Sequence, residues 1–169
     1  MRRRSFLTLG IAGAATLAAA GWWGVVRNRG DRSTTLEADA RTIVAAIVPA
    51  MLDGALPPPG RDRTSAIAET VANVDRAIQG LPAFAQAELG QLFSLLAIAP
   101  ARRAFAGVAS PWPEASVGEV AAFLDRWRDS GWSLKRSAYD ALHQLILASW
   151  YGNPRSWERI GYPGPPRIG

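Results

Sequence analysis

The chain has 169 residues, of which 49% are hydrophobic, and a formal net charge of +5. It has no cysteine and one histidine, which excludes disulfides, thiolate metal sites, covalent c-type haem and cysteine nucleophiles. Arg2, Arg3 and Arg4 supply three of the five net charges and the other basic residues are scattered among acidic ones, so we expect no nucleic-acid binding.

An export leader is predicted over residues 1–26. A basic start, a Phe-Leu pair and an uncharged stretch fit the twin-arginine type of bacterial signal, which carries folded proteins. The residues that match this signal are Arg3, Arg4, Phe6 and Leu7. We therefore expect a periplasmic protein that uses the twin-arginine translocase.

Two fates of the leader stay open. Residues 7–26 are 20 residues, long enough to cross a bilayer core of about 30 Å, although they are mostly Ala, Gly and Thr. Ala18-Ala19-Ala20 offers a small-residue cleavage site. The pair Trp22-Trp23, followed by Arg27, instead favours retention as an anchor at the inner membrane.

The rest of the chain predicts one all-α domain, a compact bundle of about five helices over residues 34–151, after a polar linker over residues 27–33. Apolar residues recur at helical spacing between glycine and proline breaks. The expected helices lie at about 34–54, 64–80, 82–100, 116–130 and 133–150, with a short helical turn at 101–106.

Two capping boxes are expected, Thr34 with Glu37 and Ser116 with Glu119. The loop at Trp112 is expected to insert its tryptophan at the edge of the core. Of the five tryptophans beyond the leader and linker, we expect two or three in the core and the others at a partner surface, because tryptophan often anchors interfaces. These tryptophans are Trp112, Trp127, Trp132, Trp150 and Trp157.

Residues 152–169 predict an extended tail, because Pro and Gly crowd around Tyr162. Such a segment loses little entropy on binding and offers aromatic anchors. Two interpretations stay open, a docking segment and a tail that folds back on its own core. If the segment docks, the partner-binding residues are Trp150, Tyr151, Trp157, Tyr162 and Pro163.

No catalytic, cofactor or metal site is predicted. His143 lies mid-helix without a nucleophile at a telling spacing, so an interior or interface role is favoured over catalysis. There is no Glu-x-x-His pair and no glycine-rich phosphate loop.

The chain resembles the small, leader-bearing subunits of bacterial membrane-associated flavin dehydrogenases, the group related to gluconate 2-dehydrogenase subunit 3. The resemblance spans nearly the whole chain, although Arg2 and Thr8 depart from the usual leader. Its most specific motif is Trp150-Tyr151-x-x-Pro154-x-x-Trp157-x-x-Ile160-Gly161-Tyr162-Pro163-Gly164-Pro165; the others are the leader, the run from Leu81-Pro82 to Leu95-Leu96, and Phe123-Leu124-x-x-Trp127-Arg128-x-Ser130.

The resemblance implies a non-catalytic partner of a large glucose-methanol-choline type dehydrogenase subunit. That subunit holds FAD and lacks its own export signal, so the small subunit's leader carries both across the membrane. A separate cytochrome subunit then accepts the electrons. The alternatives are a free-standing periplasmic helical binding protein for an apolar ligand and, third, an enzyme that uses His143 with a carboxylate.

Overall fold

The computed structural model describes residues 38–157 and 161–164. Every regular element in these residues is a helix, which confirms the all-α class. The elements are α2 (Ala38–Met51), α3 (Arg61–Gln79), α4 (Ala83–Ala97), α5 (Ala99–Ala101), a π-helical turn η1 (Arg102–Ala106), a 3-10 turn η2 (Trp112–Glu114), α6 (Val117–Arg128), α7 (Ser133–Tyr151) and α8 (Pro154–Trp157).

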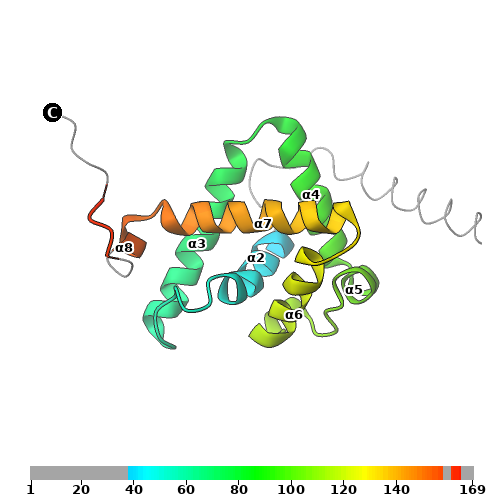
Figure 1. Cartoon of the computed structure of the whole chain (residues 1–169), viewed down its shortest axis with the longest axis horizontal. Coiled ribbons are helices and arrows are strands. Elements are labelled where there is room, and N and C mark those ends of the chain that lie inside the picture. Colours follow the sequence, from blue (N-terminus) through cyan, green and yellow to red (C-terminus); the bar gives the residue numbers. More distant parts are fainter. Residues whose placement is uncertain (1–37, 158–160, 165–169) are drawn as a thin grey trace, which may run out of the picture. The chain divides into compact units, whose positions relative to one another are not determined.

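Helix α2 lies at the centre of the core. It contacts α3, α4, α6, α7 and η2, and in Figure 1 it passes behind the long helix α7. Its apolar residues follow the 3.6-residue helical period. Four of them are fully buried: Ile43, Val44, Ile47 and Val48. The remaining helices therefore pack around one apolar rod.

A polar contact fixes α3 against α2. Arg41 Nη2 donates to Asp75 Oδ2 at 2.7 Å, and Gln79 Nε2 donates to the other carboxylate oxygen at 3.3 Å. The Asp75 side chain is only 11% exposed, so its charge needs these donors. The pair sets the rotation of α3 relative to α2, because both partners occupy fixed positions on their helices.

Four aromatic rings join η1, η2 and α6 in a continuous row. Phe105 meets Trp127 at 5.4 Å between ring centroids, Trp127 meets Phe123 at 4.7 Å, and Phe123 meets Trp112 at 6.0 Å, all edge to face. Both indole N–H groups donate to buried backbone carbonyls, Trp112 to Leu96 at 2.9 Å and Trp127 to Phe105 at 3.1 Å. The row covers the end of the core with its polar atoms paired.

Several sequence-based expectations are confirmed. Trp112 is 5% exposed and fills the core edge as predicted, and three tryptophans (Trp112, Trp127 and Trp150) are buried. Ser116 caps α6, because its hydroxyl accepts from the Glu119 N–H at 3.1 Å. The predicted box of Thr34 and Glu37, like the leader and the linker, lies outside the described residues.

One expectation needs correction. The Glu119 carboxylate does not complete a capping box with Ser116; it accepts from the backbone N–H groups of Ala109 at 2.6 Å and Ser110 at 3.2 Å. These two N–H groups lie in a loop and make no helical hydrogen bond, so the carboxylate binds them instead of the backbone N–H of Ser116. Within the expected tail, residues Pro154–Trp157 form the short helix α8, whose first position suits proline, and much of the remainder lies outside the described residues.

Gly107 ends η1 in a left-handed conformation, with φ of 69°. A Cβ atom there would lie 2.7 Å from Nη2 of Arg126, which donates to the carbonyls of Ala106 at 2.9 Å and Gly107 at 3.3 Å. The left-handed backbone therefore favours glycine here, and a Cβ atom would also displace the Arg126 guanidinium.

We predict that Trp127→Ala lowers the free energy of unfolding by about 3–5 kcal/mol, because it removes a fully buried ring from the aromatic row. Trp132→Ala is the matched control, since Trp132 is 65% exposed, and it should cost less than about 0.5 kcal/mol. Urea unfolding followed by circular dichroism measures both. Equal losses in the two variants would contradict the assigned core.

The second prediction concerns pH. The Ser110 backbone N–H, followed by other donors of this loop, holds the pKa of the Glu119 carboxyl below its ordinary value. The folded carboxyl binds a proton less readily than the unfolded one, so its stabilisation is present above the unfolded pKa and is lost as pH falls through the lower folded pKa. Glu119→Gln should have a lower free energy of unfolding at neutral pH, and this free energy should fall less as the pH is lowered.

Glu88→Gln is the control, because Glu88 is an exposed carboxylate on α4. Urea midpoints measured from neutral to acidic pH should change slope only in the Glu119 variant. An unchanged profile for Glu119→Gln would show that the loop does not depend on this carboxylate.

Candidate docking surface

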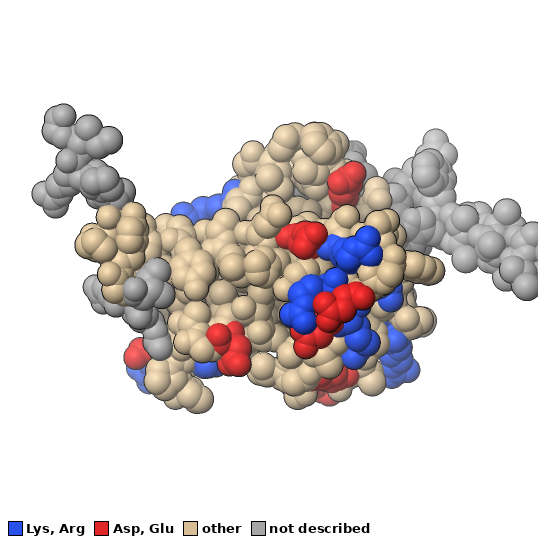
Figure 2. All heavy atoms as spheres, viewed as in Figure 1, with Lys and Arg blue, Asp and Glu red and all other residues tan. Residues whose placement is uncertain are grey.

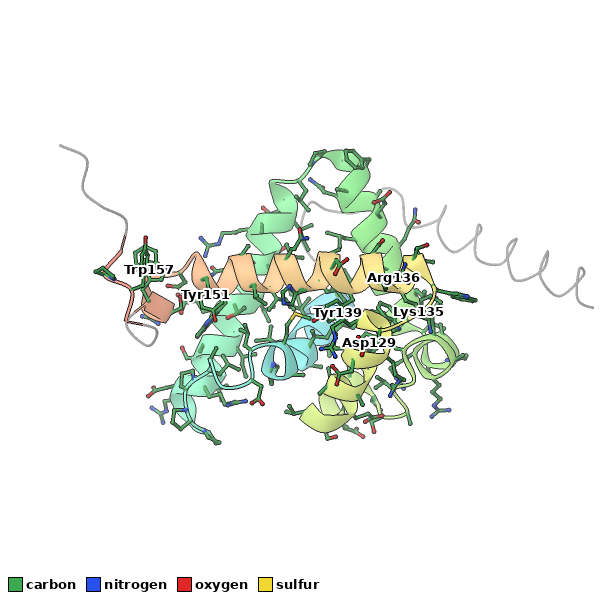
Figure 3. The ribbon with its side chains drawn as sticks, in the orientation of Figure 1. Asp129, Lys135, Arg136, Tyr139, Tyr151 and Trp157 are labelled. Atoms are coloured by element: carbon green, nitrogen blue, oxygen red, sulfur yellow. The ribbon has the colours of Figure 1, made fainter. Side chains whose placement is uncertain are left out.

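A mainly aromatic cluster begins at the C-terminal end of α7, where Figure 3 shows Tyr151 and Trp157; we call Tyr151, Trp157, Tyr162 and Pro163 the C-terminal cluster. Trp157 Nε1 donates to the Tyr151 carbonyl at 2.7 Å, and the Tyr162 N–H donates to the Trp157 carbonyl at 3.0 Å. The Trp157 and Tyr162 rings meet edge to face at 5.4 Å and 79°. The indole is thus held by its polar edge and by a neighbouring ring.

Local hydrogen bonds explain why the chain turns back here. Asn153 Oδ1 accepts from the Arg155 N–H at 3.1 Å, and the Ser156 hydroxyl donates to the Asn153 carbonyl at 2.7 Å. Gly164 has φ of 95°, and a Cβ atom there would lie 3.2 Å from the Trp157 ring. Gly164, in the Pro- and Gly-rich segment that follows α7, therefore lets the backbone pack closely on Trp157.

The structure separates the five predicted partner-binding residues. Tyr151 is 39% exposed, Tyr162 is 45% exposed, Pro163 is exposed and Trp157 is half-buried. Trp150 is only 6% exposed and packs in the core, so it offers little surface to a partner. Adjacent helical residues point about 100° apart, which is why Trp150 faces inward and Tyr151 outward.

On the face drawn in Figure 2, the second half of α7 itself is poor in charge, although Arg155 of α8 is exposed nearby. In Figure 2, acidic and basic side chains gather over α6 and the first half of α7, whereas the second half of α7 shows none on this face. Arg155 of α8 pairs with Glu69 of α3 at 3.2 Å, which ties α8 to the body. The C-terminal cluster would therefore recognise a partner by shape and apolar contact more than by charge.

A groove of about 410 Å³ lies between α3 and the end of α7. Its lining includes Glu69, Asn73, Arg76 and Asn153, and Asn73 Nδ2 already donates to the Ser149 carbonyl at 3.1 Å. Arg76 donates to the Asn73 side-chain oxygen. The polar groups at the groove are thus largely engaged with one another.

His143 is half-buried and stacks on Tyr139 one turn earlier, with 5.6 Å between ring centroids and 27° between planes. The stack is a packing contact along α7 and brings no nucleophile to the imidazole. In the part of the chain that the structure describes, no group of three potential metal ligands gathers.

The export residues Arg3, Arg4, Phe6 and Leu7 lie outside the described residues. Among the helices that are described, none has the length and apolarity needed to cross a membrane.

Sequence reasoning did not single out Trp132 or Leu134 as exposed, yet each is 65% exposed at the start of α7. A signal was present, because Trp132 lies between Gly131 and the first residue of α7, outside any periodic apolar stripe. Phe84, 69% exposed at the start of α4, was counted among the apolar residues of its helix. Periodicity alone cannot identify a residue at a helix end as exposed.

No protein-family model, curated protein or solved structure matches the chain. Its function is therefore argued from its own residues and from the resemblance described above.

We predict that Trp157→Phe loosens the C-terminal cluster, because phenylalanine keeps a ring but cannot donate to the Tyr151 carbonyl. Loss of one hydrogen bond of about 1 kcal/mol should speed hydrogen exchange of the Tyr162 amide about fivefold. Tyr151→Phe is the control, since it keeps the carbonyl that accepts the bond. Equal exchange in the wild type and Trp157→Phe would contradict the proposed constraint.

Proposed function

We propose that this chain is a non-catalytic accessory subunit that escorts an FAD-dependent alcohol or sugar dehydrogenase through the twin-arginine route and holds it in the periplasm. The observation that carries the proposal is the exposed, hydrogen-bonded C-terminal cluster, in the same segment as the motif on which the family resemblance mainly rests. The flavoprotein supplies the FAD, and this chain contributes no cofactor of its own.

The cluster suits a docking role because it is already ordered. Trp157 and Tyr162 fix each other, so little conformational entropy is lost when a partner covers them. Tyrosine and tryptophan combine a large apolar surface with a polar group, which is why they dominate binding energy at interfaces. Pro163 further restricts the exposed backbone.

The predicted leader gives the docking surface its purpose. A twin-arginine signal on one subunit can export a second, folded subunit only when the two are joined before transport. An interface built on a folded helical core, as here, is available at that stage. A cytochrome subunit would then take electrons from the flavoprotein and complete the chain of transfer to the membrane.

A free-standing binding protein is the alternative, and the groove between α3 and α7 is the feature that favours it. Its lining is half polar and internally hydrogen-bonded, so it suits an apolar ligand poorly. A rise in melting temperature with a periplasmic small molecule, with no flavoprotein bound, would support this alternative over the escort role.

We predict that the double variant Arg3→Lys with Arg4→Lys leaves both this chain and its flavoprotein in the cytoplasm, because the arginine pair is the part of the signal that the route requires. Arg2→Lys, which keeps the pair, should export both. Cell fractionation with flavin fluorescence of the affinity-purified chain measures the outcome. Normal export of the flavoprotein with the double variant would contradict the escort role.

A second arm separates export from docking. Tyr162→Ala should still export the chain but weaken flavoprotein binding about thirtyfold, the effect of losing an interface residue worth about 2 kcal/mol. Phe84→Ala is the matched control, because Phe84 is an exposed aromatic residue on α4. Equal recovery of flavin with both variants would place the interface elsewhere.

A further inference from the structure

A second exposed surface surrounds η1, and we call it the η1 surface: Arg103, Phe105, Arg126, Trp132, Leu134 and Lys135. Lys135 Nζ lies 4.9 Å from the centroid of Phe105 and 5.8 Å from that of Trp132, so the cation sits between two rings. Trp132 and Leu134, next to Lys135 in the sequence, are each 65% exposed. Apolar and cationic groups thus share one small area.

The cations of this surface have no carboxylate partners. Arg102 and Arg103 donate to the carbonyls of the loop after η1, and Arg126 donates to the carbonyls that end η1. Within residues 38–157 and 161–164, the ion pairs involve only other arginines, namely Arg41, Arg128 and Arg155. Glu119 accepts from loop N–H groups and keeps its negative charge near Arg102, so Arg103, Arg126 and Lys135 are the cations of this surface without a contact to a carboxylate of the described residues.

The position of Lys135 adds to this positive character. It lies in the first turn of α7, where the helix dipole is positive and basic residues are unfavourable. The first turns of α2, α3 and α6 instead carry Asp39, Asp62 and Glu119. The positions of Lys135 and Arg136 are therefore unfavourable with respect to the dipole of α7, and an anionic partner would be attracted by both the side chains and the helix end.

We propose that the η1 surface binds anionic phospholipid headgroups, with Trp132 and Leu134 placed at the depth of the headgroups. A projecting tryptophan and leucine flanked by Lys and Arg form the usual interfacial anchor of proteins that lie on a membrane. Two projecting apolar side chains are too few for a stable protein interface, which needs about 800 Å² per partner. A membrane contact does not need so large an area.

The two surfaces do not compete. The η1 surface lies at the start of α7 and the C-terminal cluster at its end, and 19 helical residues span about 28 Å. Figure 3 shows Lys135 and Tyr151 near opposite ends of this helix. The membrane proposal therefore stands or falls independently of the escort role.

The absence of cysteine permits a site-specific test in the full chain. Leu134→Cys and, as the control, Phe84→Cys would each carry one environment-sensitive fluorophore; both positions are similarly exposed, at 65% and 69%. With phosphatidylglycerol-containing vesicles, the label at 134 should become several-fold less accessible to aqueous acrylamide. The label at 84 should not change.

Replacing single basic residues by glutamine tests whether positive charge causes the binding to anionic vesicles. Arg103→Gln or Lys135→Gln, combined with the label at 134, should each lower the ratio of protected to accessible label about fivefold, since one basic residue near an anionic surface contributes about 1 kcal/mol. Arg155→Gln, in α8 beyond the far end of α7, should leave that ratio unchanged.

Three outcomes would overturn the proposal. These are a label at 134 that is as accessible with anionic vesicles as without them, one that pure phosphatidylcholine protects equally, and one that is already protected without vesicles. The last result would assign the η1 surface to a protein partner or to a second copy of the chain.

Discussion

The burial of α2 is the constraint on which the rest of the structure depends. Four of its side chains have no exposed surface, and they are enclosed by helices that come from three separate parts of the chain. A chain without cysteine has no covalent link to hold those helices, so their apolar faces must match α2 closely. Both exposed surfaces are therefore built on helices whose inner faces are already fixed.

Apolar spacing was sufficient to predict the helices, because α3, α6 and α7 each bury residues that recur at the helical period. Spacing could not predict the role of Glu119. Its carboxylate accepts from the N–H groups of Ala109 and Ser110, in a loop that lies near Glu119 only in the folded chain. Spacing also could not rank the tryptophans: Trp150 and Trp132 are both near an end of α7, but only the first lies over the core.

The candidate site was predicted in its composition but not in its geometry. Tyr151, Trp157 and Tyr162 were identified as anchors from the Pro-Gly context, whereas the bond from the Trp157 indole to the Tyr151 carbonyl depends on the short helix α8. That helix arises because Asn153 and Pro154 start a turn where an extended chain was expected. Both interpretations of the tail, docking and folding back on its own core, stay open, while Tyr151 and Tyr162 are each exposed.

Trp150 and Tyr151 give the chain a mechanical connection between its interior and its surface. The Trp150 ring packs among the core helices, and the carbonyl of the next residue, Tyr151, accepts from the Trp157 indole. The position of Trp157 is therefore connected through the backbone to that of the buried Trp150 ring. A partner that binds the C-terminal cluster only in its native form also raises the free energy of unfolding of the whole bundle, because binding and folding are thermodynamically linked. The bundle in turn keeps this cluster in a shape that a partner can bind.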